Sequence, residues 1–198
     1  MKKVTCIFTI AALAFGMVMA VSCKKDENGG NGGNSENLPT TLDENFDNGI
    51  PSTWNNIDAD GDGYKWQNTL ITQSGDESDP YPCAMSASYY NMIGALTPDN
   101  YLVSPKIYIE EGAKLTYEVA AIDQSYYQDH YAVLIGTMEN GAFKTVATLL
   151  EEDVPSPNTT TRTIDLSEHK GKSVCIAFRH FNCTDMYIMT IDNVKVAM

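Results

Sequence analysis

The sequence predicts an all-β protein, a sandwich or a barrel, and three features indicate this class. From Leu42 onward, several segments alternate apolar and polar residues with the period of two that a half-buried strand shows. Clusters of turn-forming residues separate these segments at short intervals. No long stretch after Leu42 has the apolar period of a helix. Many short strands joined by turns are typical of sandwiches and barrels.

The clearest strand signals lie in the second half of the chain. Residues 115–121 place apolar Leu, Tyr, Val and Ala at every second position, with polar side chains among them. Residues 131–135 (Tyr, Val, Ile) and 174–180 (Val, Ile, Phe, His) repeat the spacing of two, although most residues between them are not polar, and residues 188–196 are a fourth candidate. We therefore expect four strands here, each with at least one face in the core.

The turns are predicted from their own residue types. Asn140-Gly141 between two apolar runs is the strongest hairpin signal in the chain. Residues 182–185 are expected to turn the chain back into a strand that starts at Met186. Residues 67–81 show little periodicity, so we expect a long surface loop there.

The N-terminus has the organisation of an export signal. Lys2 and Lys3 precede an uncharged, mostly apolar run at residues 4–20, as in a secretory signal peptide. Residues 20–23 (AVSC) resemble the cleavage site of bacterial lipoprotein signal peptidase, which implies cleavage before Cys23 and lipid attachment to it. The alternative is a membrane-spanning anchor, for which about 17 apolar residues is the short limit.

The predicted domain organisation has three parts. Residues 1–22 are the signal peptide, residues 23–38 a flexible tether rich in Gly, Asn and Ser, and residues 39–198 one globular domain. Residues 24–27 (KKDE) resemble the export tag that sends lipoproteins of gut and oral anaerobes to the cell exterior. The expected location is the outer membrane, facing outward.

The composition narrows the class of partner. The chain has 26 acidic and 13 basic residues, a formal net charge of −13. Loss of the signal with its two lysines brings the mature charge to about −15. Such a surface argues against nucleic acid or anionic lipid as partner and suits divalent cations.

Three cysteines remain after the signal and the anchor, at Cys83, Cys175 and Cys183. In an oxidising compartment an odd number allows one disulfide, and the spacing leaves its pairing open.

An acidic loop is the most informative local segment. Asp58, Asp60 and Asp62 alternate with small residues, so their carboxylates gather when the chain curls at Gly61 and Gly63. Such charges repel by several kcal/mol at an effective dielectric of about 20, and a hard cation such as calcium removes that cost. The competing interpretation is a metal-free turn favoured by Asp and Gly alone.

A second group of acids lies at the two ends of the domain. Asp43, Glu44 and Asp47 are expected in the first strand and Asp192 in the last. Terminal strands often pair in sandwiches, which would bring these carboxylates together.

Several longer motifs together resemble one known family. They lie at residues 45–54 (NFDNGIPSTW), 57–63 (IDADGDG), 96–105 (LTPDNYLVSP), 129–133 (DHYAV), 177–181 (AFRHF), 184–186 (TDM) and 191–194 (IDNV). In the same order, they are similar to the gingipain haemagglutinin/adhesin domains, also called cleaved adhesin or choice-of-anchor J domains. The resemblance spans about residues 42–196.

The resemblance implies a jelly-roll β-sandwich of two antiparallel sheets, with two structural calcium ions as cofactors and no catalytic site. Carried over by motif, the first ion binds three side chains and one carbonyl, those of Asp58, Asp60, Asp62 and Tyr64. The second joins the two ends of the domain through Asn45 (carbonyl), Asp47, Asp192 and Asn193. Asp99 and the backbone before Cys83 are further candidate ligands.

The expected function is adhesion to proteins or glycans of a host or a neighbouring cell. The alternative is an accessory carbohydrate-binding module of a polysaccharide-uptake system. Catalysis is not expected, because no Ser, Cys or acid stands at motif spacing to His130 or His180, which are interpreted as strand histidines. Two adjacent tyrosine pairs, at residues 89–90 and 126–127, can present outward rings but more simply cover the sandwich rim, so no ligand-binding residue is assigned.

Overall fold

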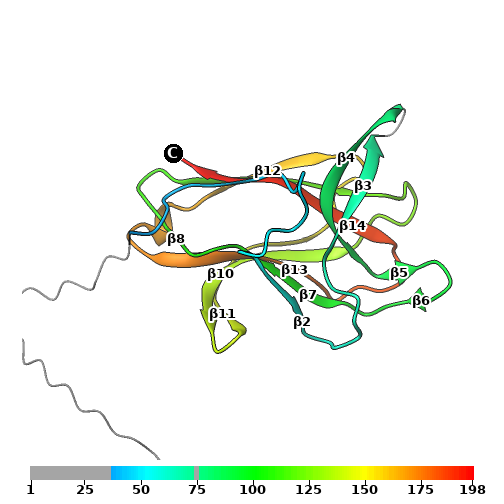
Figure 1. Cartoon of the computed structure of the whole chain (residues 1–198), viewed down its shortest axis with the longest axis horizontal. Helices are drawn as coiled ribbons and strands as arrows, with labels where there is room; N and C mark the ends of the chain where they lie inside the picture. The colour runs from blue at the N-terminus through cyan, green and yellow to red at the C-terminus, as the bar shows by residue number, and fades with distance from the viewer. Residues whose placement is uncertain (1–36, 74–75) are drawn as a thin grey trace, which may run out of the picture. The chain divides into compact units, whose positions relative to one another are not determined.

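In the computed structural model, which describes residues 37–73 and 76–198, two six-stranded antiparallel sheets face each other as the upper and lower layers of Figure 1. The first sheet has the order β12-β9-β14-β4-β3, with β1 also on β14. Its strands are β1 (Leu42–Glu44), β3 (Gln67–Gln73), β4 (Asp76–Ala87), β9 (Lys114–Ala121), β12 (Thr160–Asp165) and β14 (Ile188–Ala197).

The second sheet has the order β11-β10-β13-β7-β2, with β8 also on β13. Its strands are β2 (Asn55–Asp58), β7 (Asp99–Val103), β8 (Ile107–Tyr108), β10 (His130–Glu139), β11 (Ala142–Asp153) and β13 (Ser173–Phe181). A small ribbon of β5 (Tyr89–Tyr90) and β6 (Gly94–Ala95) and the 3-10 turn η1 (Ser167–His169) complete the described elements. The predicted all-β jelly-roll sandwich is confirmed.

The main core lies between the sheets and follows the predicted alternation. Leu115, Tyr117 and Val119 of β9 are buried, as are Tyr131 and Val133 of β10. The four predicted strands are β9, β10, β13 and β14. Burial of these side chains is the main driving force for sandwich formation.

A second cluster covers the outer face of the second sheet, which alternation alone did not predict. The intervening residues of β10 and β13 are buried too, among them Leu134, Cys175 and Ala177. Tyr101 and Phe143 pack against them. These two strands are therefore buried on both faces.

The β10–β11 hairpin is built as predicted. Glu139 pairs with Ala142, and the two residues between them are Asn140 and Gly141, with φ of 51° and 81°. These left-handed conformations are those that Asn and Gly tolerate in a two-residue hairpin loop.

The prediction of a surface loop at residues 67–81 is wrong. Residues 67–73 and 76–81 belong to the hairpin of β3 and β4, and β3 is the edge strand of the first sheet. Gln67, Asn68 and Leu70 are exposed, and no side chain among residues 67–71, whose burial is described, is fully buried, so this part of the strand has no buried stripe to produce an apolar alternation.

Residues 182–185 do form a connection, but it joins different sheets. β13 belongs to the second sheet and β14, which begins at Ile188, to the first. The turn therefore carries the chain across the sandwich rather than into a hairpin. Asn182 and Asp185 adopt positive φ, 54° and 57°, which allows the tight change of direction.

The described cysteines carry no disulfide: Cys83, Cys175 and Cys183 are free thiols. The predicted signal peptide, Cys23 and most of the tether lie outside the described residues. Within the described ranges, no helix has the length and apolar character needed to cross a membrane.

Candidate functional site

The acidic loop connects β2 to β3, and its own carboxylates organise its backbone. Asp58 accepts hydrogen bonds from the N–H groups of Gly61 and Gly63, at 2.7 and 2.9 Å. Asp62 accepts one from the N–H of Tyr64 at 2.7 Å. Gly61 and Gly63 have φ of 75° and 89°, so the curl requires residues that accept left-handed conformations.

The three predicted carboxylates converge. One oxygen of each of Asp58, Asp60 and Asp62 lies within 4.8 Å of the others. Burial and the adjacent Asp58 carboxyl raise the pKa of Asp60, since one carboxylate disfavours ionisation of the other. This geometry and repulsion suit a hard cation with oxygen ligands.

The loop is fixed to strand β7 through Asp99. The N–H of Asp99 donates to the Asp60 carboxylate at 2.9 Å, and its carbonyl accepts from the N–H of Ala59. Its own carboxylate, by contrast, forms a two-point ion pair with Arg179, at 2.7 and 3.0 Å. Asp99 therefore positions the loop through its backbone, while its side chain is bound to a cation of the protein.

The Tyr64 carbonyl, the fourth predicted ligand of the loop, accepts a hydrogen bond from the Asn100 side chain at 2.9 Å. A carbonyl oxygen has two lone pairs, so this hydrogen bond leaves one lone pair available to a cation.

The predicted meeting of the two ends of the domain also occurs. β1 pairs with β14, and Glu44 lies opposite Val194. β1 ends at Glu44, so Asp47 lies beyond the strand in which it was expected. The buried Phe46, with φ of 53°, makes the bend, and its N–H donates to Glu44 at 2.8 Å.

Asp192 is the centre of this second acidic group. Burial raises its pKa to about 6, and the charges of Glu118, Asp47 and Glu44 add to the increase. The hydrogen bond from the N–H of Asn193 acts in the opposite direction and lowers the pKa. Glu118 stands directly opposite Asp192 on the adjacent strand β9. Like charges in this position destabilise a sheet, so the pair suits a bound cation.

Asn45 and Asn193 frame the same group. The Asn45 side chain is hydrogen bonded to Asp47, and that of Asn193 donates to Glu118 at 2.9 Å. Glu118 was missed by the sequence analysis. Its only sequence signal is a charge in a strand, which normally indicates a solvated face.

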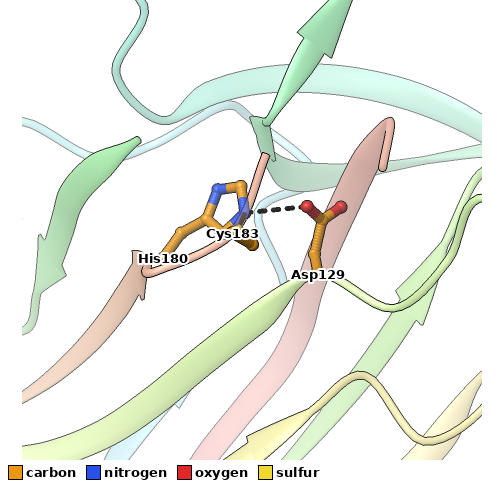
Figure 2. A group of neighbouring side chains, drawn as sticks. All are labelled: Asp129, His180 and Cys183. Atoms are coloured by element: carbon orange, nitrogen blue, oxygen red, sulfur yellow. Dashed lines mark hydrogen bonds and ion pairs between the residues drawn. The ribbon is translucent and has the colours of Figure 1, made fainter. Parts of the chain in front are cut away.

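A third group of side chains consists of Asp129, His180 and Cys183 (Figure 2). His180 of β13 directs Nε2 at Asp129, which lies just before β10, and Nε2 is 3.1 Å from Oδ1. The Sγ of Cys183 is also 3.1 Å from Nε2. His180 and Asp129 are fully buried and Cys183 partly so. The sequence placed His180 at the end of the expected strand 174–180 and did not predict this group.

This arrangement is not that of a thiol nucleophile with its base. Burial and the charge of Asp129 raise the pKa of the Cys183 thiol, so the thiolate is disfavoured at neutral pH. The acid and the thiol also contact the same imidazole nitrogen, whereas a triad needs the acid on the other one.

Two hollows open on the surface. The tyrosine hollow, of about 450 Å³, is lined by three rings, two carboxylates and an amide, from Tyr89, Asn91, Asp123, Tyr126, Asp185 and Tyr187. The larger hollow, of about 590 Å³, is lined chiefly by apolar side chains and Tyr81, including exposed Leu70 and Ile122.

Comparison with known proteins shows to which family this sequence and fold are similar. The model of the family described as Cleaved Adhesin Domain matches residues 39–196. Hemagglutinin A of Porphyromonas gingivalis is 37% identical over 177 residues, covering 79% of this chain and 6% of that protein. Gingipain R1 of the same species is 37% identical over 173 residues, covering 10% of its length. The chain thus spans about a tenth or less of these curated relatives.

Solved structures agree with this result. The K1 cleaved adhesin domain of Lys-gingipain from P. gingivalis W83 is 35% identical, with a TM-score of 0.66 over 80% of this chain and 98% of that one. The K3 domain is 35% identical, with a TM-score of 0.67 over 79% and 97%. TmCBM61, solved with β-1,4-galactotriose, shares the fold at 9% identity, with a TM-score of 0.52 over 78% and 94%.

The fold therefore defines a jelly-roll domain of the adhesin class, related in architecture to a carbohydrate-binding module. The chain belongs to the cleaved adhesin family, as its sequence motifs indicated. The part of Lys-gingipain that it matches is described as a cleaved adhesin domain.

Proposed function

We propose that this chain is a cell-surface lipoprotein of the outer membrane whose adhesin domain, braced by two calcium ions, holds proteins or glycans of host or neighbouring cells. The observation that carries the proposal is the match of an adhesin domain to almost the whole described chain, residues 39–196. The proposed role is binding, without a catalytic step. Its only membrane contact is the lipid on Cys23.

The first proposed calcium site is the acidic loop. Asp58, Asp60 and Asp62 supply carboxylate oxygens, and Tyr64 supplies its carbonyl. The support is the convergence of three carboxylates with a raised pKa at Asp60. Asp99 orders the loop through its N–H, since its carboxylate is paired with Arg179.

The second proposed calcium site joins β1 to β14. Asp47 and Asp192 supply carboxylates, with the Asn45 carbonyl and Asn193 beside them. Glu44 and Glu118 add two acids whose charges act on Asp192. A divalent ion here neutralises this repulsion and ties the first strand to the last.

Surface attachment suits a binding domain of this kind. Many copies fixed on one surface convert weak single contacts into strong collective attachment, as in any multivalent system. A flexible tether lets each domain orient toward its partner.

The direct test is agglutination of red cells and retention on collagen-coated surfaces by cells that display the full-length chain. We expect both in calcium and a loss of both in chelator. If cells display the chain in calcium but do not agglutinate red cells, are not retained on collagen and bind no glycan, the adhesin proposal is contradicted.

The tyrosine hollow favours glycan capture as a second candidate function. Aromatic rings stack on sugar faces, carboxylates accept hydrogen bonds from sugar hydroxyls, and amides both donate and accept them. Tyr126, which is 56% exposed, is the most accessible of the three rings that line this hollow. On an array of neutral plant polysaccharides, Tyr126→Ala should abolish binding, whereas Tyr108→Ala, at an exposed ring outside the hollow, should not.

A further inference from the structure

The buried group of Asp129, His180 and Cys183 has an unusual contact pattern at one atom. Nε2 of His180 is 3.1 Å from the Asp129 carboxylate and 3.1 Å from the Cys183 sulfur. An imidazole nitrogen carries either one proton or one lone pair, so it makes one strong hydrogen bond. Two polar groups nevertheless approach it (Figure 2).

The contact of the other ring nitrogen, Nδ1, bears on which tautomer His180 adopts. Nδ1 is 2.7 Å from Oγ of Ser86, which also accepts a hydrogen bond from Asn100. When Nδ1–H donates to Ser86, Nε2 presents a lone pair toward the Asp129 oxygen. In this tautomer the Nε2 lone pair and the Asp129 oxygen can bind one metal ion between them, whereas in the other tautomer Ser86 donates to Nδ1 and Nε2–H donates to Asp129 Oδ1.

Buried hydroxyls orient the ligands on both sides. Ser88 donates its hydroxyl proton to Asp129 Oδ1 and accepts the N–H of Met186 at 3.1 Å. Ser86 holds the imidazole from the other side, because in the metal-binding tautomer its oxygen accepts the Nδ1–H. Metal sites typically have such partners behind their carboxylate and imidazole ligands.

The carboxylate is also incompletely satisfied. Oδ2 of Asp129 is buried and has no hydrogen-bond partner. A buried acceptor without a partner destabilises the fold, and a charged one does so more strongly. A metal ion bound by the carboxylate would offset this cost, whereas a proton on Nε2 satisfies only Oδ1.

We propose that Asp129, His180 and Cys183 form a binding site for one Zn²⁺ ion, separate from the acidic loops. Imidazole, thiolate and carboxylate together are a borderline-soft set that suits Zn²⁺, whereas calcium prefers oxygen ligands alone. Zn²⁺ displaces the thiol proton to solvent, and its two charges balance the thiolate and the carboxylate. The partly exposed Cys183 gives the ion its route from solvent, and water completes the coordination.

The test uses the full-length chain, stripped of metal and kept in excess calcium so that the acidic loops are saturated. Titration with Zn²⁺ against a chromophoric chelator should give one ion per chain. Titration with Co²⁺ should give a thiolate-to-metal charge-transfer band. No stoichiometric Zn²⁺ binding, or Co²⁺ binding without that band, would overturn the proposal.

Variants assign the site. Cys183→Ser should remove the Co²⁺ band and weaken Zn²⁺ binding at least tenfold. Ser86→Ala should weaken Zn²⁺ binding about 10–100-fold, because it removes the hydrogen bond that orients the imidazole. Cys175→Ser, at a buried thiol on the other side of the second sheet, should change neither. Should Cys183→Ser fail to fold, the Co²⁺ charge-transfer band of the unaltered chain and the Zn²⁺ affinity of the Ser86→Ala variant still test the proposal. Unchanged binding in the Cys183 or Ser86 variant would exclude this site.

Discussion

The phenol oxygens of Tyr117 and Tyr131 lie 2.9 Å apart across the interior of the sandwich. Tyr117 belongs to β9 of the first sheet and Tyr131 to β10 of the second. The Tyr131 hydroxyl donates onward to Glu152 at 2.7 Å, and Glu152 forms a two-point ion pair with Arg162 of β12, at 2.8 and 2.9 Å. A series of hydrogen bonds, ending in an ion pair, therefore runs from the first sheet to the second and back to the first.

Tyr117→Phe should destabilise the domain by about 1 kcal/mol, the typical net value of one hydrogen bond. The loss is limited because Tyr131 keeps its bond to Glu152. Urea unfolding measures it, with Tyr126→Phe on the exposed rim as the control. A stability equal to that of the unaltered chain would mean that the contact between the two hydroxyls adds nothing.

Gly136→Ala should be far more damaging than an ordinary glycine substitution. A Cβ at Gly136 would lie 2.1 Å from the Lys144 carbonyl oxygen and 2.7 Å from the Phe143 ring, inside the β10–β11 hairpin. We expect a loss of about 1–3 kcal/mol or more from overpacking.

Gly141→Ala is the matched control, because its Cβ meets open space and only the left-handed φ of 81° is strained. That strain costs about 1–2 kcal/mol. Equal or smaller destabilisation by Gly136→Ala would contradict the close approach.

Much of the fold follows from local sequence, and the exceptions have physical causes. β9 and the Asn140-Gly141 hairpin are read directly from alternation and turn chemistry. β3 was missed because an exposed edge strand needs no apolar stripe. The sheet change after β13 depends on packing of distant strands, which no local pattern encodes.

The same distinction applies to the sites. Asp58, Asp60 and Asp62 are adjacent in sequence, so their spacing alone predicts their convergence. Asp129 and Cys183 are far apart in sequence, and Glu118 meets Asp192 only through strand register. Such groups are predictable only once the topology is known.

His130 should make stability depend on pH near neutrality. Burial disfavours its protonation, but hydrogen bonds to Asp153 and Glu151, at 2.7 and 3.2 Å, outweigh this and raise its pKa. A raised pKa stabilises the fold fully below the unfolded value of about 6.5, and this stabilisation is lost as pH rises through the folded value.

His130→Asn should therefore flatten the decrease in stability between about pH 6 and pH 8. Thermal melts at matched ionic strength measure the slope, and added salt should reduce the difference because both acids are partly exposed. Parallel pH profiles for the two proteins would contradict this assignment.

The proposed anchor has its own test. Cys23→Ala should abolish incorporation of labelled fatty acid and release the protein from the membrane fraction, whereas Cys6→Ala, within the predicted signal, should leave both unchanged. Retained labelling in the Cys23 variant would show that lipid is attached elsewhere.

The acidic loop gives the sharpest prediction, because calcium should reverse the effect of one substitution. Asp60→Asn removes a charge but keeps an oxygen that can accept the N–H of Asp99. In chelator the variant should be at least as stable as the unaltered chain, since repulsion among the three carboxylates falls. In calcium it should be less stable, because a bound ion at 100 times its Kd contributes about 2.7 kcal/mol that the variant largely loses. Thermal melts in both conditions measure this, with Asp165→Asn as a charge-matched control on β12. A metal-free turn would give the same difference between variant and unaltered chain with and without calcium.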